Sequence, residues 1–540
     1  MTPLRPISPA EVPGSAGAVW LVRILALLPA ALAIAALGTA MAFRVPAPFA
    51  LEWQEPAMLE HSLRIAAGEP LYVRPSIEFA PFPYPPLFPL AGALSVSLLG
   101  PSLMALRLVS LLGIVLLGAS LLRSFKGVAG VMVVGWWAAT YGWSGFWVDV
   151  ARVDTLALGL GAVAFALVLA VEGRATESSD GDGVAAGGLW WAGAAGLASA
   201  LAVLTKQTQL GLAVALAVVL LGRARTRRAG AVYLGAMLAV MVPIVLWLEH
   251  VSSGWFLWTT VDLLRGSPFH GPAVWEFWTE SSLVLGVPLA LGLLAHVVGA
   301  KDGLGAGPGG SSGPGGWRSG WSPTLGLGCA ALVLTGWIGR AHEGGFDNTL
   351  MPVALASAFA CGGPLRRLSL TRVPQVVGAA LVAIAMAIHL PRIARVLPDA
   401  ADHAAYSEAC AKVEALRQAG PVWQPISALP SGAPGYIHKM AIVDLAKSRE
   451  TTVAAELLSD LREALVGKQF AAVILAMPPR EGWGDLAPLI EAHYEVTGRL
   501  GATTAPGGPG GAGPGAGARS ALTPVTGAAL APRWILTPRR

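Results

Sequence analysis

Long apolar runs alternate with short polar connections along this chain, and the pattern predicts a bundle of membrane-spanning helices. A run of about 20 apolar residues crosses a bilayer as a helix. Eleven such spans are predicted, at residues 18–43, 101–122, 127–147, 154–172, 187–205, 208–222, 229–249, 279–299, 323–341, 345–364 and 373–391. The apolar stretch 86–99 is shorter and begins next to Pro85-Pro86, which favours an interfacial or re-entrant helix.

Basic residues give this topology a direction, because short cytoplasmic loops carry an excess of Lys and Arg. With the N-terminus inside, every compact basic cluster falls in an inside loop: Arg123 and Lys126; Arg223, Arg225, Arg227 and Arg228; Arg366, Arg367 and Arg372. The opposite loops hold isolated charges and amides: Asp149, Arg152 and Asp154; Lys206 and Gln207; Asp262 and Arg265; Arg340, Glu343, Asp347 and Asn348. We therefore expect a multi-pass membrane protein, with these polar residues on the extracytoplasmic side.

The composition agrees with this picture. Of the 540 residues, 54% are hydrophobic and 13% charged, which excludes an ordinary soluble globular protein. The net charge of +5 reflects loop orientation in such a protein, so no nucleic-acid partner is predicted. Three cysteines are too few for a disulfide framework.

The hydropathy changes near residue 399, where the sequence becomes typical of a small α/β domain. Residues 402–419 and 453–466 have the periodicity of amphipathic helices, whereas 422–428, 471–477 and 533–536 have the pattern of buried strands. The predicted organisation is a transmembrane domain at 1–398, with a first outside loop at 44–100, and an extracytoplasmic α/β domain at 399–540. Gly-rich segments at 301–320 and 503–519 are predicted to be disordered.

The first outside loop contains five acids among aromatic residues and prolines: Glu52, Glu55, Glu60, Glu69 and Glu78. The predicted outside helix ends add Asp154, Arg152 and Lys206. Considered one at a time, these residues need no function: Asp154 and Arg152 would form a local ion pair, and Lys206 would extend its ammonium group to the membrane–water interface. Their appearance on one face favours a common cavity, because a charge at the depth of a helix end is costly unless it meets water, a partner or a substrate.

Such a cavity suits an anionic, lipid-linked substrate. Arginine and lysine bind phosphate, and a carboxylate accepts the proton of an incoming hydroxyl. A lipid carrier cannot leave the bilayer, so the enzyme that uses it must be a membrane protein.

Several motifs resemble the GT-C superfamily of membrane glycosyltransferases, in particular bacterial family 39, of the protein mannosyltransferase and aminoarabinose transferase type. The motifs are the acidic first loop, Gly68-Glu69-Pro70-Leu71-Tyr72, Tyr84-Pro85-Pro86-Leu87, Gly100-Pro101, Arg107, Ala151-Arg152-Val153-Asp154, Leu204-Thr205-Lys206-Gln207-Thr208 and Gly344-Gly345-Phe346-Asp347-Asn348. The resemblance covers residues 18–390 and not the C-terminal domain.

This resemblance implies a protein of the bacterial inner membrane. It also implies an inverting transfer of a sugar, on the extracytoplasmic side, from a polyprenyl-phosphate donor to a lipid, glycan or protein acceptor. Glu55 is the preferred catalytic base and Glu52 the second candidate, with Asp154 orienting the acceptor or the base. Arg152 and Lys206 would bind the donor phosphate. Further substrate contacts are expected from Tyr84, Gln207, Asp347 and Asn348. Some relatives use a divalent metal and others do not, and two or three carboxylates are able to hold one.

Two other functions fit parts of the sequence. Charges within a membrane also mark translocation pathways, which leaves a transporter or flippase of a lipid-linked or anionic substrate open. A non-catalytic envelope-assembly protein would explain the C-terminal domain but not the acidic first loop. Product formation from a polyprenyl-phosphate sugar, as opposed to flux across sealed vesicles, separates these alternatives.

Overall fold

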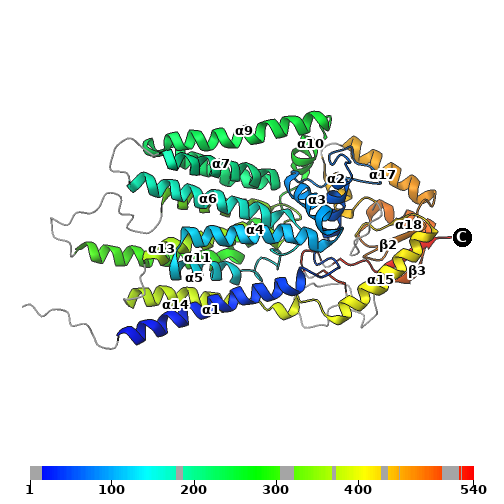
Figure 1. Cartoon of the computed structure of the whole chain (residues 1–540). Coiled ribbons are helices and arrows are strands. Elements are labelled where there is room, and N and C mark those ends of the chain that lie inside the picture. The colour runs from blue at the N-terminus through cyan, green and yellow to red at the C-terminus, as the bar shows by residue number, and fades with distance from the viewer. Residues whose placement is uncertain are drawn as a thin grey trace, which may run out of the picture.

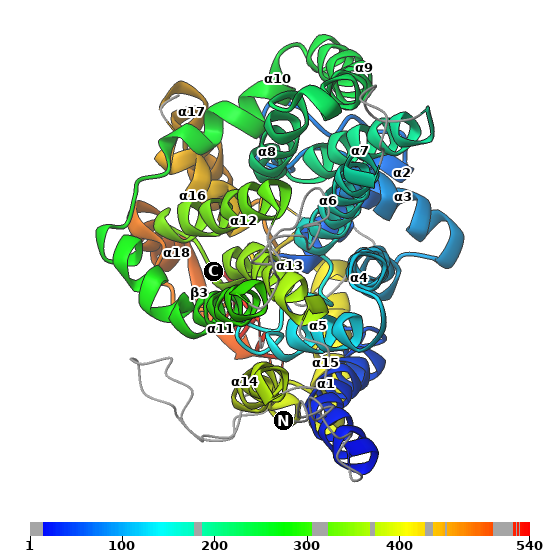
Figure 2. The ribbon, with the colours of Figure 1, turned by 90° about the vertical axis from the view of Figure 1, so that its left-hand side faces the viewer.

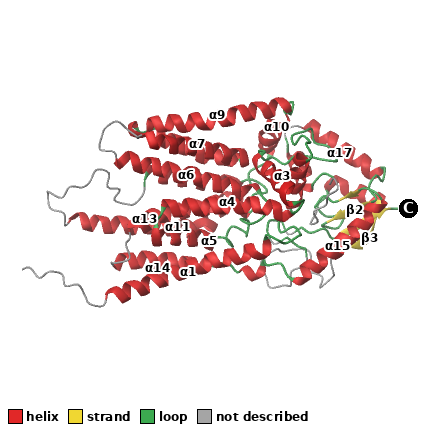
Figure 3. Cartoon of the chain, in the orientation of Figure 1, coloured by secondary structure: helices red, strands yellow, loops and turns green. Residues whose placement is uncertain are grey.

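The computed structural model describes residues 15–177, 186–304, 322–367, 373–426, 436–448, 451–500, 522–524, 526–528 and 530–540. Figure 1 shows a bundle of long helices lying side by side, with a smaller group of helices and strands at one end. Loops and strands gather at that same end (Figure 3).

A helix lies at each of the eleven predicted positions. These helices are α1 (Ser15–Arg44), α4 (Leu103–Ser124), α5 (Gly127–Ala139), α6 (Val153–Glu177), α7 (Ala186–Thr205), α8 (Leu210–Leu221), α9 (Arg227–Val251), α11 (Gly271–Leu304), α12 (Pro323–Ala341), α13 (Met351–Arg367) and α14 (Val373–His389). Among the described residues, seven helices are long and apolar enough to cross a membrane, or eight if one bent pair counts as a span. The chain is therefore a multi-pass membrane protein, while the number eleven stays a prediction.

One predicted span is shorter than expected. α5 ends at Ala139, eight residues before the predicted end at 147. Gly145 and Phe146 have positive φ angles of 69° and 57°, so the chain turns here and continues as a loop to α6. This loop carries Asp149 and Arg152 toward the end of the bundle.

Shorter elements cover the end of the bundle that carries the polar loops. They are α2 (Glu55–Ala66), α3 (Leu87–Leu99), η1 (Gln207–Gln209), α10 (Trp255–Leu257), the π-helix η3 (Trp258–Asp262), η4 (Leu263–Gly266) and η5 (Asp347–Leu350). α3 corresponds to the predicted short apolar helix at 86–99. Its outer face is apolar, with Leu94 63% and Leu98 74% exposed, as expected of a helix that contacts lipid.

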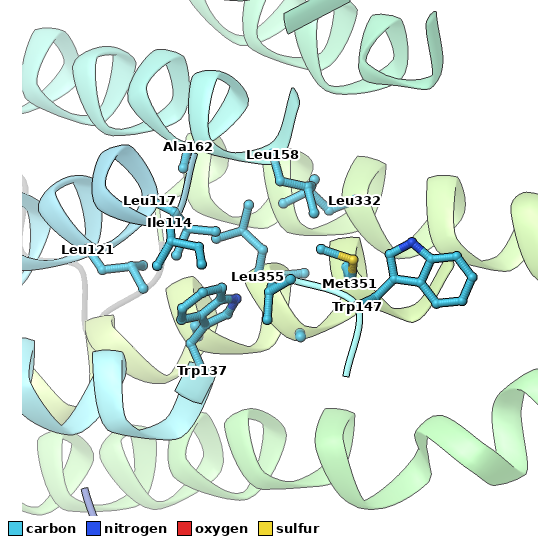
Figure 4. Packing of buried hydrophobic residues seen from close by; sticks show 14 of the residues in the cluster. Ile114, Leu117, Leu121, Trp137, Trp147, Leu158, Ala162, Leu332, Met351 and Leu355 are labelled. Atoms are coloured by element: carbon cyan, nitrogen blue, oxygen red, sulfur yellow. The ribbon is translucent and has the colours of Figure 1, made fainter. Parts of the chain in front are cut away.

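α6 lies inside the bundle and α9 on its outside (Figure 2). In the apolar span of α6, 72% of the residues are buried, against 17% in that of α9. α4 and α6 approach closely at two glycines: a Cβ at Gly113 would lie 2.4 Å from the Thr155 carbonyl oxygen, and one at Gly159 would lie 2.3 Å from the Gly113 carbonyl oxygen. Small residues at such crossings are typical of membrane helix packing. Leucine, isoleucine and tryptophan side chains of α4, α5, α6, α12 and α13 fill the space between the helices (Figure 4).

The elements described after residue 399 are α15 (Ala400–Ala419), β1 (Val422–Trp423), α16 (Lys439–Lys447), α17 (Thr451–Val466), β2 (Ala472–Leu475), η7 (Gly484–Leu486), α18 (Ala487–His493), β3 (Tyr494–Arg499) and β4 (Trp534–Pro538). They form a four-stranded sheet in the order β1-β2-β4-β3, in which β1 and β2 are parallel and β4 is antiparallel to both of its neighbours. An element lies at each predicted position, although β1 covers only Val422–Trp423 of the predicted strand 422–428, and α16, α18 and β3 are additional. Asp399 begins α15 by a reciprocal capping box with Asp402.

This α/β part is docked on the first loop. Phe49 lies 5.3 Å from the His403 ring and 5.9 Å from the Tyr406 ring of α15. The predicted division at residue 398 into two domains stays a prediction. The segments predicted to be disordered fall mostly outside the described residues, although α11 continues through 301–304.

Candidate active site

A buried arginine of α4 fixes the start of the first loop. Arg107 donates hydrogen bonds to the carbonyl oxygens of Arg44 at 2.9 Å, Ala47 at 2.6 Å and Phe49 at 2.8 Å. These carbonyls lie at or just after the end of α1, where no helical N–H group is left to pair with them. The guanidinium therefore folds the chain back over the end of the bundle.

Glu55 completes this arrangement as the partner of Arg107. Its two carboxylate oxygens accept bonds from Arg107 Nε at 2.8 Å and Nη2 at 2.6 Å. They also accept the backbone N–H groups of Leu51 and Ala151, each at 2.7 Å. Burial alone would raise the pKa of Glu55, but Arg107 and these hydrogen bonds lower it overall. Glu55 is thus a carboxylate whose oxygens are already occupied.

Glu52, three residues earlier, has different surroundings. Its Oε2 accepts the Gln54 N–H at 2.9 Å and lies 3.4 Å from Arg152 Nη1. Its Oε1 is buried and has no hydrogen-bond partner among the residues that the structure describes. Burial, only partly offset by the charge of Arg152, raises the pKa of Glu52 to about 7.

Arg152 joins Glu52 to two other predicted site residues. Its Nη2 donates to the Tyr84 hydroxyl at 2.8 Å, and its Nε lies 4.0 Å from Asp154 Oδ2. Neither Arg152 Nε nor Asp154 Oδ2 makes a hydrogen bond within the described part of the chain. The two atoms are buried and form a long ion pair with each other.

Asp154 continues the network toward Lys206 and Asn348. Its Oδ1 accepts bonds from Lys206 Nζ at 2.5 Å and from Asn348 Nδ2 at 3.1 Å. A small cavity of about 30 Å³ lies beside these three residues. Its other lining residues are Leu158, Thr208, Gln209, Thr335, Gly339, Thr349 and Pro352. This small cavity thus adjoins the ion pair of Asp154 and Lys206.

Two of the predicted substrate-binding residues, Gln207 and Asp347, contact groups outside this network. Gln207 Nε2 donates to the carbonyl oxygens of Pro83 at 2.8 Å and Thr260 at 3.1 Å, so it connects the first loop to η3. Asp347 is half exposed, and its Oδ1 lies 3.4 Å from Arg340 Nη1. The structure therefore brings six predicted residues into one continuous network: Glu52, Tyr84, Arg152, Asp154, Lys206 and Asn348.

A second ion pair, which was not predicted, lies next to this network. Arg44 Nε donates to Asp149 Oδ2 at 2.7 Å, and the Tyr141 hydroxyl donates to Asp149 Oδ1 at 2.9 Å. Thr526, from the C-terminal segment, lies 3.3 Å from Arg44 Nη2 and pairs with the backbone beside Glu52. Nothing local in the sequence identifies Thr526, because 482 residues separate it from Arg44.

His438 also lies close to the first loop. Its Nδ1 accepts the Met440 N–H at 3.1 Å, and its Nε2 lies 3.3 Å from the Trp53 carbonyl oxygen, which fits a neutral ring. Burial lowers the pKa of His438 to about 3. Its contacts are those of a structural residue that caps α16.

The acids of the site are each placed next to a cation. Among the described residues, no group of three or more His, Cys, Asp or Glu side chains is arranged to hold a metal ion. We accordingly assign no chemical step to a metal.

No protein-family model and no curated protein matches this chain. Among solved structures, it is similar to apo ArnT from Cupriavidus metallidurans, with a TM-score of 0.53 and 15% identity over 88% of this chain and 95% of that one. ArnT from the same organism bound to undecaprenyl phosphate gives a TM-score of 0.45 and 17% identity, covering 84% and 82% of the two chains. An oligosaccharyltransferase from Archaeoglobus fulgidus gives a TM-score of 0.39 and 13% identity, covering 72% of this chain and 58% of that one. The likeness to apo ArnT shows that the chain has a GT-C fold, as its motifs predict.

Proposed function

We propose that this chain, which has the GT-C fold, is a membrane glycosyltransferase that uses a polyprenyl-phosphate-linked sugar. The observation that carries the proposal is the continuous network from Glu52 through Arg152 and Asp154 to Lys206. It combines a carboxylate that has an oxygen without a partner with two cations, of which Lys206 lines a small cavity together with Asp154. Transfer of a sugar from a lipid phosphate to a hydroxyl or amine requires these groups.

We assign the base role to Glu52 rather than to Glu55. Glu52 Oε1 has no partner in the described residues, whereas both oxygens of Glu55 are occupied. A pKa of about 7 also suits a general base, which works best when its pKa is near the operating pH. This assignment reverses the order of preference that the sequence motifs gave.

The proposed reaction is a single displacement with inversion at the anomeric carbon. Glu52 accepts the proton of the acceptor hydroxyl or amine while that atom bonds to the anomeric carbon. The bond from this carbon to the phosphate oxygen breaks, and its electron pair stays on the polyprenyl phosphate. Arg152 and Lys206 stabilise the phosphate charge, and Asp154 positions Lys206.

The lipid part of the donor would enter along the apolar α3, beside Tyr84. ArnT, which shares the fold, has been solved with undecaprenyl phosphate bound. We extend this class of lipid to the present chain and place its phosphate on the extracytoplasmic side, at the end of the bundle opposite the basic clusters. The cell-envelope acceptor would approach from the α/β part.

The test uses the full chain in nanodiscs with undecaprenyl-phosphate-linked mannose, glucose or aminoarabinose, and membrane extracts as the acceptor. Glu52→Gln should reduce product formation by a factor of about 10² to 10⁴, because it removes the general base. Glu69→Gln, in the same loop but in an exposed pair with Arg64, should leave transfer unchanged. Undiminished transfer by Glu52→Gln would remove Glu52 from this role. Donor flux into sealed vesicles without product would favour a transporter instead.

A further inference from the structure

Residues 526–528, near the C-terminal end of the chain, cover the unpartnered oxygen of Glu52. A Cβ placed on Gly527 would lie 3.2 Å from Glu52 Oε1. On its other sides this Cβ would meet Trp53 Cδ1 at 3.1 Å and Trp147 Cη2 at 3.0 Å. Glu52 is consequently 0% exposed, although the proposed reaction requires an acceptor to reach it.

The groups under this segment suit a ligand that carries hydroxyl groups. Glu52 Oε1 accepts hydrogen bonds and Trp53 Nε1, which is bonded to the Cδ1 beside Gly527, donates them; both atoms are buried without a partner among the described residues. Buried polar atoms normally have partners, so these two point to a ligand that supplies them. A hydroxyl group donates and accepts, and the indoles of Trp53 and Trp147 add apolar area. The place that Gly527 fills is therefore suited to the acceptor.

The hydrogen bonds between this segment and its surroundings are long. Within the described residues, they all come from Thr526, which also forms a parallel β-bridge with Glu52. Its N atom lies 3.3 Å from the Leu51 carbonyl oxygen, and its Oγ1 lies 3.3 Å from Arg44 Nη2 and 3.2 Å from the Phe146 carbonyl oxygen. Such bonds usually measure ~2.9 to 3.0 Å, so the segment is weakly held.

The chain on either side of this segment is held more firmly. Before it, Leu522 is buried in the apolar core, at 3% exposure. After it, the Arg533 N–H donates to the Leu475 carbonyl oxygen at 2.9 Å, and β4 follows in the sheet between β2 and β3. The segment is thus able to move while both of its ends stay in place.

We propose that residues 526–528 are a strap that fills the acceptor subsite, and that a hydroxylated acceptor displaces it to reach Glu52. The inference rests on the proposed function and extends it. The closed strap lowers the apparent affinity for the acceptor, because binding requires the open state. It also keeps water away from Glu52 until an acceptor binds, which limits hydrolysis of the donor.

Gly527→Ala tests the strap, with Gly68→Ala as its matched control. The φ angles of the two glycines are 74° and 78°, so a side chain causes similar backbone strain at both. An added Cβ meets Glu52 and two indoles at Gly527, but no atom within 4 Å at Gly68. Gly527→Ala should therefore disfavour the closed strap. In the nanodisc assay, it should lower the amount of membrane extract needed for half-maximal transfer about tenfold, whereas the control should match the wild type.

Hydrogen–deuterium exchange follows the strap without any need for transfer. Peptides that cover residues 526–528 should exchange about tenfold faster in Gly527→Ala than in the wild type, and peptides of β4 should not change. Equal exchange in the two proteins, or a higher acceptor requirement together with a lower Tm, would identify a fixed wall and overturn the inference while the proposed function stands. Absence of transfer by the wild type with every donor would instead reject the proposed function, and the exchange measurement would still decide whether the segment opens.

Discussion

Two glutamates of the first loop, three positions apart, differ in their surroundings and therefore in what they are able to do. Glu55 is held by Arg107 and two backbone N–H groups, and it supports the loop. Glu52 has a free buried oxygen beside Arg152. The same functional group is structural at one position and available for chemistry at the other, because of its partners.

This contrast predicts a loss of stability in Glu55→Gln. The substitution leaves Arg107 charged, buried and without its ion-pair partner, which should lower the free energy of unfolding by about 3 to 5 kcal/mol. The matched change Glu69→Gln removes only an exposed ion pair, which contributes about 0 to 1 kcal/mol. Thermal unfolding in detergent measures both variants. A Glu55→Gln protein with normal Tm and no transfer would instead identify Glu55 as the base.

Glu52 also predicts a pH dependence. Its pKa is about 7 in the folded protein, against an ordinary value of 4.5, so the folded state binds the proton more tightly. Stability from this group is therefore greatest below pH 4.5 and decreases as the pH rises to 7. Activity changes in the opposite direction, because only the deprotonated carboxylate accepts a proton. We expect kcat/KM to rise with an apparent pKa near 7, and Glu52→Gln to lack this rise in its residual activity. A profile that is flat from pH 5 to 9 in the wild type would contradict the assignment.

At the scale of helices, the site depends on how closely α4 approaches α6. α4 carries Arg107, and Asp154 lies in the first turn of α6. Gly113 and Gly159 allow the two backbones to meet near Thr155, the residue after Asp154. The crossing therefore sets the position of Asp154 relative to the first loop.

Gly113→Ala should disturb this crossing. Its Cβ would lie 2.4 Å from the Thr155 carbonyl oxygen, which cannot move without displacing α6, and overpacking of this kind costs about 1 to 3 kcal/mol. We expect both Tm and transfer to decrease. Gly118→Ala, on the same helix but with no atom within 4 Å of the added Cβ, should be neutral or stabilising. Equal behaviour of the two variants in both measurements would show that the crossing does not control the site.

At the scale of the whole molecule, the charges divide between the two ends of the bundle. Arg123 and Arg174 lie over Trp191, at 4.4 and 5.2 Å from its ring, and Arg223 pairs with Glu172, all at the end away from the site. The network of Glu52, Arg152 and Lys206 lies at the other end, under the α/β part (Figure 1). This separation predicts a cytoplasmic and an extracytoplasmic end.

Cysteine labelling tests the orientation directly. In a variant whose native cysteines have been replaced, Arg225→Cys should react with a membrane-impermeant maleimide only after the cells are opened. Asp347→Cys, near the proposed site, should react in intact spheroplasts. Labelling of both positions from one side would contradict the predicted topology, whatever the activity of the protein.

The sequence alone determined the helices and the side of the bundle on which the polar residues gather. Apolar length is a local property, and successive antiparallel helices return the chain to the same face, so Glu52, Arg152, Lys206 and Asn348 were predicted to lie together. After residue 399, the positions of α15, α17, β1, β2 and β4 followed from periodicity in the same way, whereas α16, α18 and β3 were not predicted. The early end of α5 was missed, since apolar residues continue into the loop that follows it.

Only the tertiary structure decided which acid is free. Glu55 receives the N–H of a residue 96 positions away, and Glu52 meets an arginine 100 positions away. The tertiary structure also makes Asn348 a hydrogen-bond donor to Asp154 and leaves the adjacent Asp347 half exposed. It packs α16 against the first loop. The chemistry of a carboxyl group depends on its burial and its hydrogen-bond partners, and here those partners come from distant parts of the chain.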